Sequence, residues 1–241
     1  MHRFFADENG VQGNLARLES EDARHALRVL RLQAGARIVL FAGGSAYAAE
    51  IADTQGGEVT ARILGFLPSP EASVRVTLYQ GVPKGDKMDY IVQKCTEAGV
   101  ARIVPVNMPR CVSRLAADDE KKLARWNRIA REAAKQAFRP LTPQVTPPME
   151  MKALPEALRR HELALVPWEE ARDGALRTLL SPAVRDVALV IGPEGGMGAQ
   201  EVAPLLCAGA KAVTLGPRIF RTETAGLAAL VAVMTLTENL E

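Results

Sequence analysis

The chain has 241 residues, of which 48% are hydrophobic and 24% are charged, and its formal net charge is only +2. This composition is typical of a folded globular protein and excludes a disordered or collagen-like chain. Three cysteines without a C-x-x-C pair argue against a disulfide framework and a structural zinc site, and they fit a reducing compartment. The apolar stretch from Ala225 to Leu236 is too short to cross a bilayer. We therefore expect a cytoplasmic protein with no membrane partner and no bound metal.

The first 66 residues contain short apolar runs separated by glycine pairs at positions 43–44 and 56–57. A helix is expected before these runs, with Ser20 as its N-cap and its end before Gly35. Two prolines, at positions 68 and 70, indicate a linker. We predict a small β-barrel domain with one helix over residues 1–70, and its strands are expected at Arg37–Phe41, Ala46–Ile51 and Glu58–Leu64.

From residue 74 the pattern changes to apolar strands that alternate with helices. This alternation predicts an α/β domain over residues 74–241, with a parallel sheet covered on both faces. The strands are expected at Val74–Gln80, Arg102–Val106, Leu163–Pro167, Asp186–Ile191 and Lys211–Leu215. The helices are expected at about 86–98, 119–137, 171–180 and 199–208, and from about 223.

Two loops that follow predicted strands are candidates for ligand binding. Glycines in Gly192-Pro-Glu-Gly-Gly196 would let the backbone approach a ligand, although for such a loop taken alone a tight strand-to-helix turn is the favoured explanation. The spacing fits neither a dinucleotide-binding loop nor a Walker A loop. The second loop follows the strand expected at Lys211–Leu215. At its end Thr222 is expected to cap the last helix, with Glu223 in the first turn of that helix. Arg218 and Arg221 oppose the dipole of that helix, so an anionic partner would explain them better.

Basic residues gather in three places. Lys84 and Lys87 stand at the start of a helix that Asp86 could cap, near the expected carboxyl edge of the sheet. They could bind a ligand at that edge, or they could equally be ordinary solvated surface lysines. Residues 110–139 hold 9 basic and 4 acidic side chains. In this segment one helical stripe would form a phosphate-binding surface rather than an ordinary solvated face; it consists of Lys121, Arg125, Arg128 and Lys135. A third basic group lies in the N-terminal region, at Arg3, Arg24, Arg28 and Arg31.

Taken together, these segments resemble the uridine-N3 methyltransferases of 16S ribosomal RNA, which belong to the SPOUT, or trefoil-knotted, class. The resemblance implies a PUA-like barrel followed by a knotted parallel-sheet α/β domain, a homodimer, and S-adenosyl-L-methionine as the cofactor. Its substrate would be the small ribosomal subunit, with the assembled particle preferred over naked RNA. The matching stretches follow the family order across nearly the whole chain: Arg3–Phe5, His25–Arg31, Lys84–Asp89, Val92–Gly99, Trp126–Ala134, Ile191–Gly196 and Leu215–Ala225.

The resemblance also implies roles for individual residues. Arg221 would favour the deprotonated uracil, and either Glu223 or Glu194 would accept the N3 proton. The cofactor would be held by three loops, through Leu165, Pro167, Gly192, Glu194, Gly195, Leu215, Gly216, Ile219, Phe220, Thr224 and Ala225. The RNA would be contacted by Arg3, Arg28, Arg31, Lys84, Lys87, Arg125 and Arg128.

Two departures from the family pattern accompany this resemblance. Lys135-Gln-Ala-Phe138 stands where the family commonly has Glu-Gln-Ser-Gly, and Phe220 stands where it usually has leucine. Two other functions remain open. One is a SPOUT methyltransferase that modifies a ribose 2′-oxygen or another base, and the other is a non-catalytic RNA-binding assembly factor.

Overall fold

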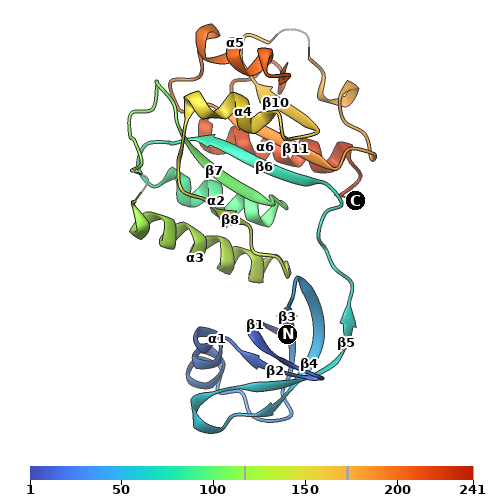
Figure 1. The fold of residues 1–241 in the computed structure, drawn as a ribbon. Coiled ribbons are helices and arrows are strands. Elements are labelled where there is room, and N and C mark those ends of the chain that lie inside the picture. The colour runs from blue at the N-terminus through green and yellow to red at the C-terminus, as the bar shows by residue number, and fades with distance from the viewer. Residues whose placement is uncertain (117, 172–173, 241) are drawn as a thin grey trace. The chain divides into compact units, whose positions relative to one another are not determined.

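The computed structural model describes residues 1–116, 118–171 and 174–240 (Figure 1). It separates into two compact units, of which the first comprises Met1–Glu71 and Ala134–Leu141 and the second comprises Ala72–Ala133 and Thr142–Glu241. The division expected from the sequence therefore needs one correction. Residues 134–141 were expected in the C-terminal domain, but they belong to the N-terminal unit.

The N-terminal unit contains a closed barrel in the order β1-β2-β5-β4-β3. Only β1 and β3 pair in parallel, and the other neighbours are antiparallel. The predicted barrel is confirmed, but β1 and β2 were not among the expected strands. Polar residues interrupt the apolar pattern of β1, and its register shifts between Ala6 and Val11. The strands are β1 (His2–Gln12), β2 (Leu15–Leu18), β3 (Arg37–Ala42), β4 (Ser45–Asp53) and β5 (Thr60–Leu67).

The helix of this unit differs in two respects from the expected one. Helix α1 (Ser20–Arg24) continues into a π-helical turn over His25–Val29. Glu19, and not Ser20, occupies the N-cap position, and no side chain caps this helix. The Glu19 carbonyl oxygen accepts the first hydrogen bond of the helix, 2.8 Å from the Ala23 amide, so the serine signal placed the cap one residue late.

A buried carboxylate, Asp22, connects α1 to the rest of the unit. Only 2% of the Asp22 residue is exposed, and its Oδ2 accepts a hydrogen bond of 2.6 Å from the backbone amide of Phe5. Its Oδ1 forms an ion pair with Nζ of Lys135. A buried charge requires such partners. Lys135 therefore pairs with the barrel unit and does not belong to the phosphate-binding stripe that the sequence predicted.

Two further contacts explain why residues 134–141 belong to this unit. The Arg3 guanidinium donates hydrogen bonds to the carbonyl oxygens of Lys135 and Gln136, at 3.0 and 2.9 Å. The ring of Phe138 packs edge-on against Phe41, with 5.8 Å between the centroids. This segment therefore completes the packing of the barrel.

The second unit is built on a parallel sheet in the order β12-β10-β11-β6-β7-β8, with β9 paired to β7. The five predicted strands and their parallel arrangement are confirmed. The short strands β8 and β9 were not expected, because two residues are too few for a hydrophobic pattern. The strands are β6 (Arg75–Gly81), β7 (Arg102–Asn107), β8 (Gln144–Val145), β9 (Met149–Glu150), β10 (Leu163–Pro167), β11 (Asp186–Ile191) and β12 (Lys211–Val213).

Helices cover both faces of this sheet, as the alternating pattern predicted (Figure 1). One face packs on α2 (Lys87–Glu97), α3 (Glu120–Gln136) and α6 (Thr222–Leu236). The other face packs on α4 (Leu154–Leu158) and α5 (Ala199–Cys207). Successive side chains of β11 enter opposite cores, since Leu189 belongs to the first cluster and Val190 to the second. Among the residues described, no helix has the length and apolar character needed to cross a membrane.

Four local predictions for this unit were wrong or incomplete. The helix expected over 171–180 is reduced to a 3-10 turn at Leu176–Thr178, and residues 172–173 of that prediction lie outside the described residues. Helix α4 was not expected. Asp86 occupies the N-cap position of α2 without a hydrogen bond from its side chain, and Arg221 rather than Thr222 occupies that position on α6.

We expect the Asp22→Ala variant to lose about 3–5 kcal/mol of unfolding free energy, because it leaves the Lys135 ammonium without its buried partner. Urea denaturation followed by circular dichroism measures this loss. Glu21→Ala is the matched control, since Glu21 is exposed one position away and should cost less than about 1 kcal/mol. Equal losses in the two variants would contradict a structural role for the Asp22 carboxylate.

Candidate functional site

A cavity of about 670 Å³ lies where three loops of the second unit meet. These loops follow β10, β11 and β12, and the third leads directly into α6. Because the strands are parallel, their carboxyl ends share one edge of the sheet, where open α/β folds bind ligands. The volume is within the range of small-molecule sites in proteins.

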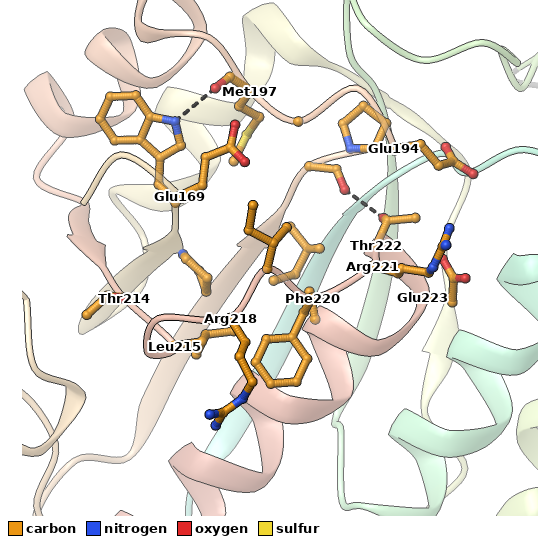
Figure 2. A pocket seen from close by; sticks show the side chains of 18 of the residues that line it. Glu169, Glu194, Met197, Thr214, Leu215, Arg218, Phe220, Arg221, Thr222 and Glu223 are labelled. Carbon is orange, nitrogen blue, oxygen red and sulfur yellow. Dashed lines mark hydrogen bonds between the residues drawn. The ribbon is translucent and has the colours of Figure 1, made fainter. Parts of the chain in front are cut away.

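The glycine loop after β11 is held in place by close backbone contacts and a chain of buried hydrogen bonds. A Cβ atom on Gly81 would lie only 2.6 Å from the backbone nitrogen of Pro193, so β6 and this loop touch without intervening side chains. The Thr222 hydroxyl donates a hydrogen bond of 2.7 Å to the carbonyl oxygen of Gly192 (Figure 2). It also accepts one of 2.9 Å from Nε2 of Gln80. Thr222 therefore ties α6 to the loop, which is why its side chain does not cap the helix.

Trp168 makes the corresponding connection for the loop after β10. Its indole Nε1 donates a hydrogen bond of 2.8 Å to the carbonyl oxygen of Met197 (Figure 2). Its backbone amide donates one of 3.0 Å to the carbonyl oxygen of Val213, at the end of β12. One residue thus fixes the ends of all three loops relative to one another.

A charged cluster occupies one end of the cavity, where Figure 2 shows Glu194, Arg221 and Glu223 close together. Nζ of Lys87 lies 3.0 Å from Oε1 of Glu194 and 3.2 Å from Oε2 of Glu223. The backbone amide of Lys84 donates a further hydrogen bond of 2.9 Å to Oε1 of Glu194. Lys87 therefore bridges the two carboxylates that the sequence singled out as proton acceptors.

These contacts set the protonation of the cluster. Burial raises the pKa of Glu194, but the hydrogen bonds from the Lys84 amide and the Lys87 ammonium outweigh it, so the pKa is lowered overall. The pKa of Glu223 is lowered by its own backbone amide and by Lys87, against the effect of burial. Glu194 and, more weakly, Glu223 raise the pKa of Lys87. At neutral pH the cluster contains two carboxylates and one ammonium.

The cavity brings together most of the residues expected to bind a cofactor or take part in the reaction. They are Pro167, Gly192, Glu194, Gly195, Leu215, Gly216, Ile219, Phe220, Arg221, Glu223 and Ala225. Two expected residues are not among those that line it. Leu165 is completely buried in β10, and the Thr224 hydroxyl donates a hydrogen bond to the carbonyl oxygen of Arg221.

Several lining residues were not expected. They include Trp168, Glu169, Gly196, Met197, Thr214, Pro217, Arg218 and Thr222. Most of them adjoin an expected residue in one of the three loops. Their position in these loops is therefore the sequence feature that could have identified them as lining residues. Arg218 also carried its own signal, since it opposes the dipole of α6. Nothing in the sequence pattern distinguished Trp168 or Glu169.

The residues expected to contact RNA do not form a single site. Lys87 lines the cavity and is paired there, while Arg3 holds residues 135–136. Arg125 forms an ion pair with Asp89, which also accepts a hydrogen bond of 3.1 Å from the indole of Trp126. The remaining expected side chains are exposed; they are Arg28, Arg31, Lys84 and Arg128. The predicted stripe on α3 is therefore partly neutralised within the protein.

Comparisons with known proteins agree with this architecture. Residues 70–234 match the family described as RNA methyltransferase domain, and residues 18–64 match the RNA methyltransferase PUA domain. A protein of Mycobacterium tuberculosis named ribosomal RNA small subunit methyltransferase E is 33% identical over 242 residues, which cover 98% of this chain and 92% of that protein.

Two solved structures are similar over nearly their full length. A ribosomal RNA small subunit methyltransferase E from Neisseria gonorrhoeae, bound to S-adenosyl methionine, is 35% identical with a TM-score of 0.82, and 98% of each chain is covered. A methyltransferase from Legionella pneumophila in complex with the same cofactor is 30% identical with a TM-score of 0.83, covering 97% of this chain and 96% of that one.

We expect the Lys87→Met variant to raise the pKa of both Glu194 and Glu223, because the shared ammonium favours their charged forms. Carbon NMR of the glutamate carboxyl groups, recorded as a function of pH, measures the two pKa values. In the parent both lie below the ordinary glutamate pKa of 4.5. In the parent, the bridge stabilises the fold above that pH and loses its effect as falling pH protonates the carboxylates.

Lys94→Met is the matched control, since Lys94 pairs with Glu97 on the exposed side of α2. It should leave the titrations of the two cavity carboxylates unchanged. Unchanged titrations in Lys87→Met as well would show that the Lys87 bridge is absent in solution.

Proposed function

The chain belongs to the RNA methyltransferase family that includes the ribosomal RNA small subunit methyltransferases E, and we propose that it methylates N3 of a uridine in 16S ribosomal RNA. The methyl donor in this proposal is S-adenosyl-L-methionine. The observation that carries the proposal is the cavity between three loops at the carboxyl edge of the sheet, in a chain that is similar to these enzymes along its whole length.

The residues of the cavity suit this cofactor. Leu215, Ile219 and Phe220 offer an apolar wall for a purine ring. Glu169 offers a carboxylate to cationic or hydroxyl groups, and the glycine loop offers backbone amides and carbonyls. When bound, the cofactor supplies an electrophilic methyl group on a sulfonium. The task of the protein is to align the uracil with that group and to stabilise the loss of the N3 proton.

Arg221 is the residue that we propose for stabilising the deprotonated uracil. It stands at the N-cap position of α6, exposed at the charged end of the cavity. Positive charge beside the base favours its anionic form. Of the two carboxylates, we propose Glu223 as the proton acceptor. Oε1 of Glu194 accepts two hydrogen bonds, from the Lys84 amide and the Lys87 ammonium, whereas Oε2 of Glu223 faces the Lys87 ammonium at the longer distance of 3.2 Å. Because its pKa is lowered, Glu223 is ionised at neutral pH but is a weak base, so its acceptance of the proton depends on the positive charge of Arg221 beside the uracil.

The RNA would be held by exposed basic side chains of each unit. We propose that Arg28 and Arg31 of the PUA unit and Arg128 of α3 contact phosphate groups. A target base inside a folded particle must leave its stack to reach the cavity, and folded RNA is recognised largely by shape. The assembled small subunit is therefore the proposed substrate, rather than naked RNA.

We also propose that the α/β unit carries the trefoil knot of the SPOUT class, that the protein acts as a homodimer, and that it acts in the cytoplasm. The convergence of the loops after β10, β11 and β12 on one cavity supports the knot. Exposed apolar side chains, Ile219 in the cavity wall at 82% and Val231 further along α6 at 38%, support a partner subunit. The unpaired cysteines fit a reducing compartment. Sedimentation of the purified protein tests the dimer.

Calorimetry with S-adenosylhomocysteine, followed by mass spectrometry of methylated ribosomal RNA, tests the proposed function. A non-catalytic assembly factor need not bind the cofactor product. A ribose 2′-O-methyltransferase, or one that acts on another base, would bind it but would place the methyl group on a different atom. Methylation at uridine N3 is the expected result, and either alternative result would overturn the proposal.

We expect Arg221→Ala to lower kcat by about 10²-fold or more, since it removes positive charge that is needed in the transition state. Affinity for RNA should fall much less. Single-turnover methylation and filter binding separate the two effects. Arg218→Ala is the control from the same loop, and its kcat should stay within about threefold of the parent, because Arg218 lies away from the charged cluster in Figure 2. Equal losses in the two variants would remove the special role of Arg221.

We expect Arg128→Ala to flatten the slope of log K for RNA binding against log salt by about 0.9 if the contact is to a duplex. Arg125→Ala should change the slope by less, because Asp86 and Asp89 already partly neutralise its guanidinium. Equal slopes for Arg128→Ala and the parent would show that α3 presents an ordinary solvated face.

A further inference from the structure

Arg110, in the segment after β7, contacts the glycine loop from outside the cavity. Its Nη1 donates a hydrogen bond of 3.1 Å to the carbonyl oxygen of Gly195. Its Nε lies 3.4 Å from Oε2 of Glu201 in the first turn of α5. Gly195 lines the cavity, and Arg110 is not among the described residues that do so.

Glu201 extends this contact to the start of α5. The same Oε2 atom accepts a hydrogen bond of 2.8 Å from the backbone amide of Gly198, which is the N-cap residue of that helix. Arg110 therefore acts on both ends of the segment 195–198: directly on the Gly195 carbonyl, and through Glu201 on the Gly198 amide. Fixing both ends limits the rotation of the peptide groups that face the cavity.

The two glycines at these ends make room for Arg110. A Cβ atom on Gly195 would lie 3.1 Å from Cβ of Arg110, and one on Gly198 would lie 2.6 Å from its Nη2. The backbone of Gly198 does not itself require glycine, since its φ of −80° and ψ of 165° suit any residue. A side chain at this position would therefore require the guanidinium of Arg110 to move from its place.

We propose that Arg110 is a positioning residue that fixes the second cofactor loop without touching the cofactor or the RNA. The inference rests on the proposed function, since it assumes that the cavity binds S-adenosyl-L-methionine. Arginine suits the task because one planar group donates a hydrogen bond from Nη1 to the Gly195 carbonyl while it forms an ion pair with Glu201 through Nε. A lysine has a single ammonium on a flexible stem and cannot reproduce that geometry.

Arg110→Ala tests the inference through cofactor affinity. The Kd for S-adenosylhomocysteine, measured by calorimetry, should rise about tenfold or more, in line with the loss of a hydrogen bond from a charged donor. The KM for the cofactor should rise likewise, while kcat at saturating cofactor changes by less than about threefold. Arg110→Lys should recover only part of the affinity. A residue that served global stability alone would lower the melting temperature without this split between KM and kcat.

Arg114→Ala is the matched control. Arg114 lies on the same segment, its side chain is 64% exposed, and the nearest carboxylate oxygen that it pairs with, in Glu150, is 3.9 Å away. Its removal should leave both Kd and KM unchanged.

A double-mutant cycle with Gly198→Ala gives an independent test. In the parent the added methyl group must displace Nη2 of Arg110, so the affinity for S-adenosylhomocysteine should fall. In the Arg110→Ala background that clash is absent, and the same methyl group should have no further effect. Additive effects of the two substitutions would overturn the inference.

These experiments distinguish failure of the proposed function from failure of the role proposed for Arg110. A parent protein that does not bind S-adenosylhomocysteine refutes the proposed function. A parent that binds it, together with an Arg110→Ala variant that binds equally well, refutes only the role of Arg110. If Arg110→Ala does not fold, Gly198→Ala and Arg110→Lys carry the test, and undiminished affinity in both would refute that role.

Discussion

The cavity depends on one buried hydrogen-bond chain, from the Gln80 amide to the Thr222 hydroxyl and on to the Gly192 carbonyl. This chain joins the end of β6, the loop after β11 and the first turn of α6. Leaving one of these buried groups without its partner would cost about 1–3 kcal/mol. Three segments distant in sequence are thereby held within hydrogen-bonding distance. This chain fixes the α6 end of the loop after β12 beside the glycine loop, while the Trp168 amide holds the β12 end through the Val213 carbonyl.

The charged end of the cavity is built on the same frame. Lys87 comes from α2, Glu194 from the glycine loop and Glu223 from α6, so their bridge forms only because the loops are fixed. Its consequence is chemical. Carboxyl groups with a lowered pKa remain ionised at neutral pH, so they are weak bases and their main effect is on the local electric field. Removal of a proton from uracil at such a site depends on nearby positive charge, which is the role proposed for Arg221.

The sequence predicted the sheet well because strands buried on both faces are continuous apolar runs, as in 186–191. It also located the glycine loop and the loop before α6, because glycine and capping residues follow local rules. It did not predict pairs that tertiary packing decides. Lys87 was expected at an RNA surface, but its partner Glu194 is 107 positions away. Thr222 was read as a cap, because nothing local shows that its hydroxyl is needed by Gly192.

The departure from the family pattern at Lys135–Phe138 has its explanation within the barrel unit. Lys135 pairs with the buried Asp22, and Phe138 packs on Phe41 with the Arg3 guanidinium 5.4 Å from its ring centroid. The lysine therefore neutralises a buried carboxylate of the N-terminal unit, and the aromatic ring covers an apolar surface of the same unit. The residues proposed for methyl transfer keep their own contacts, so this departure gives no reason to assign the chain a different chemistry.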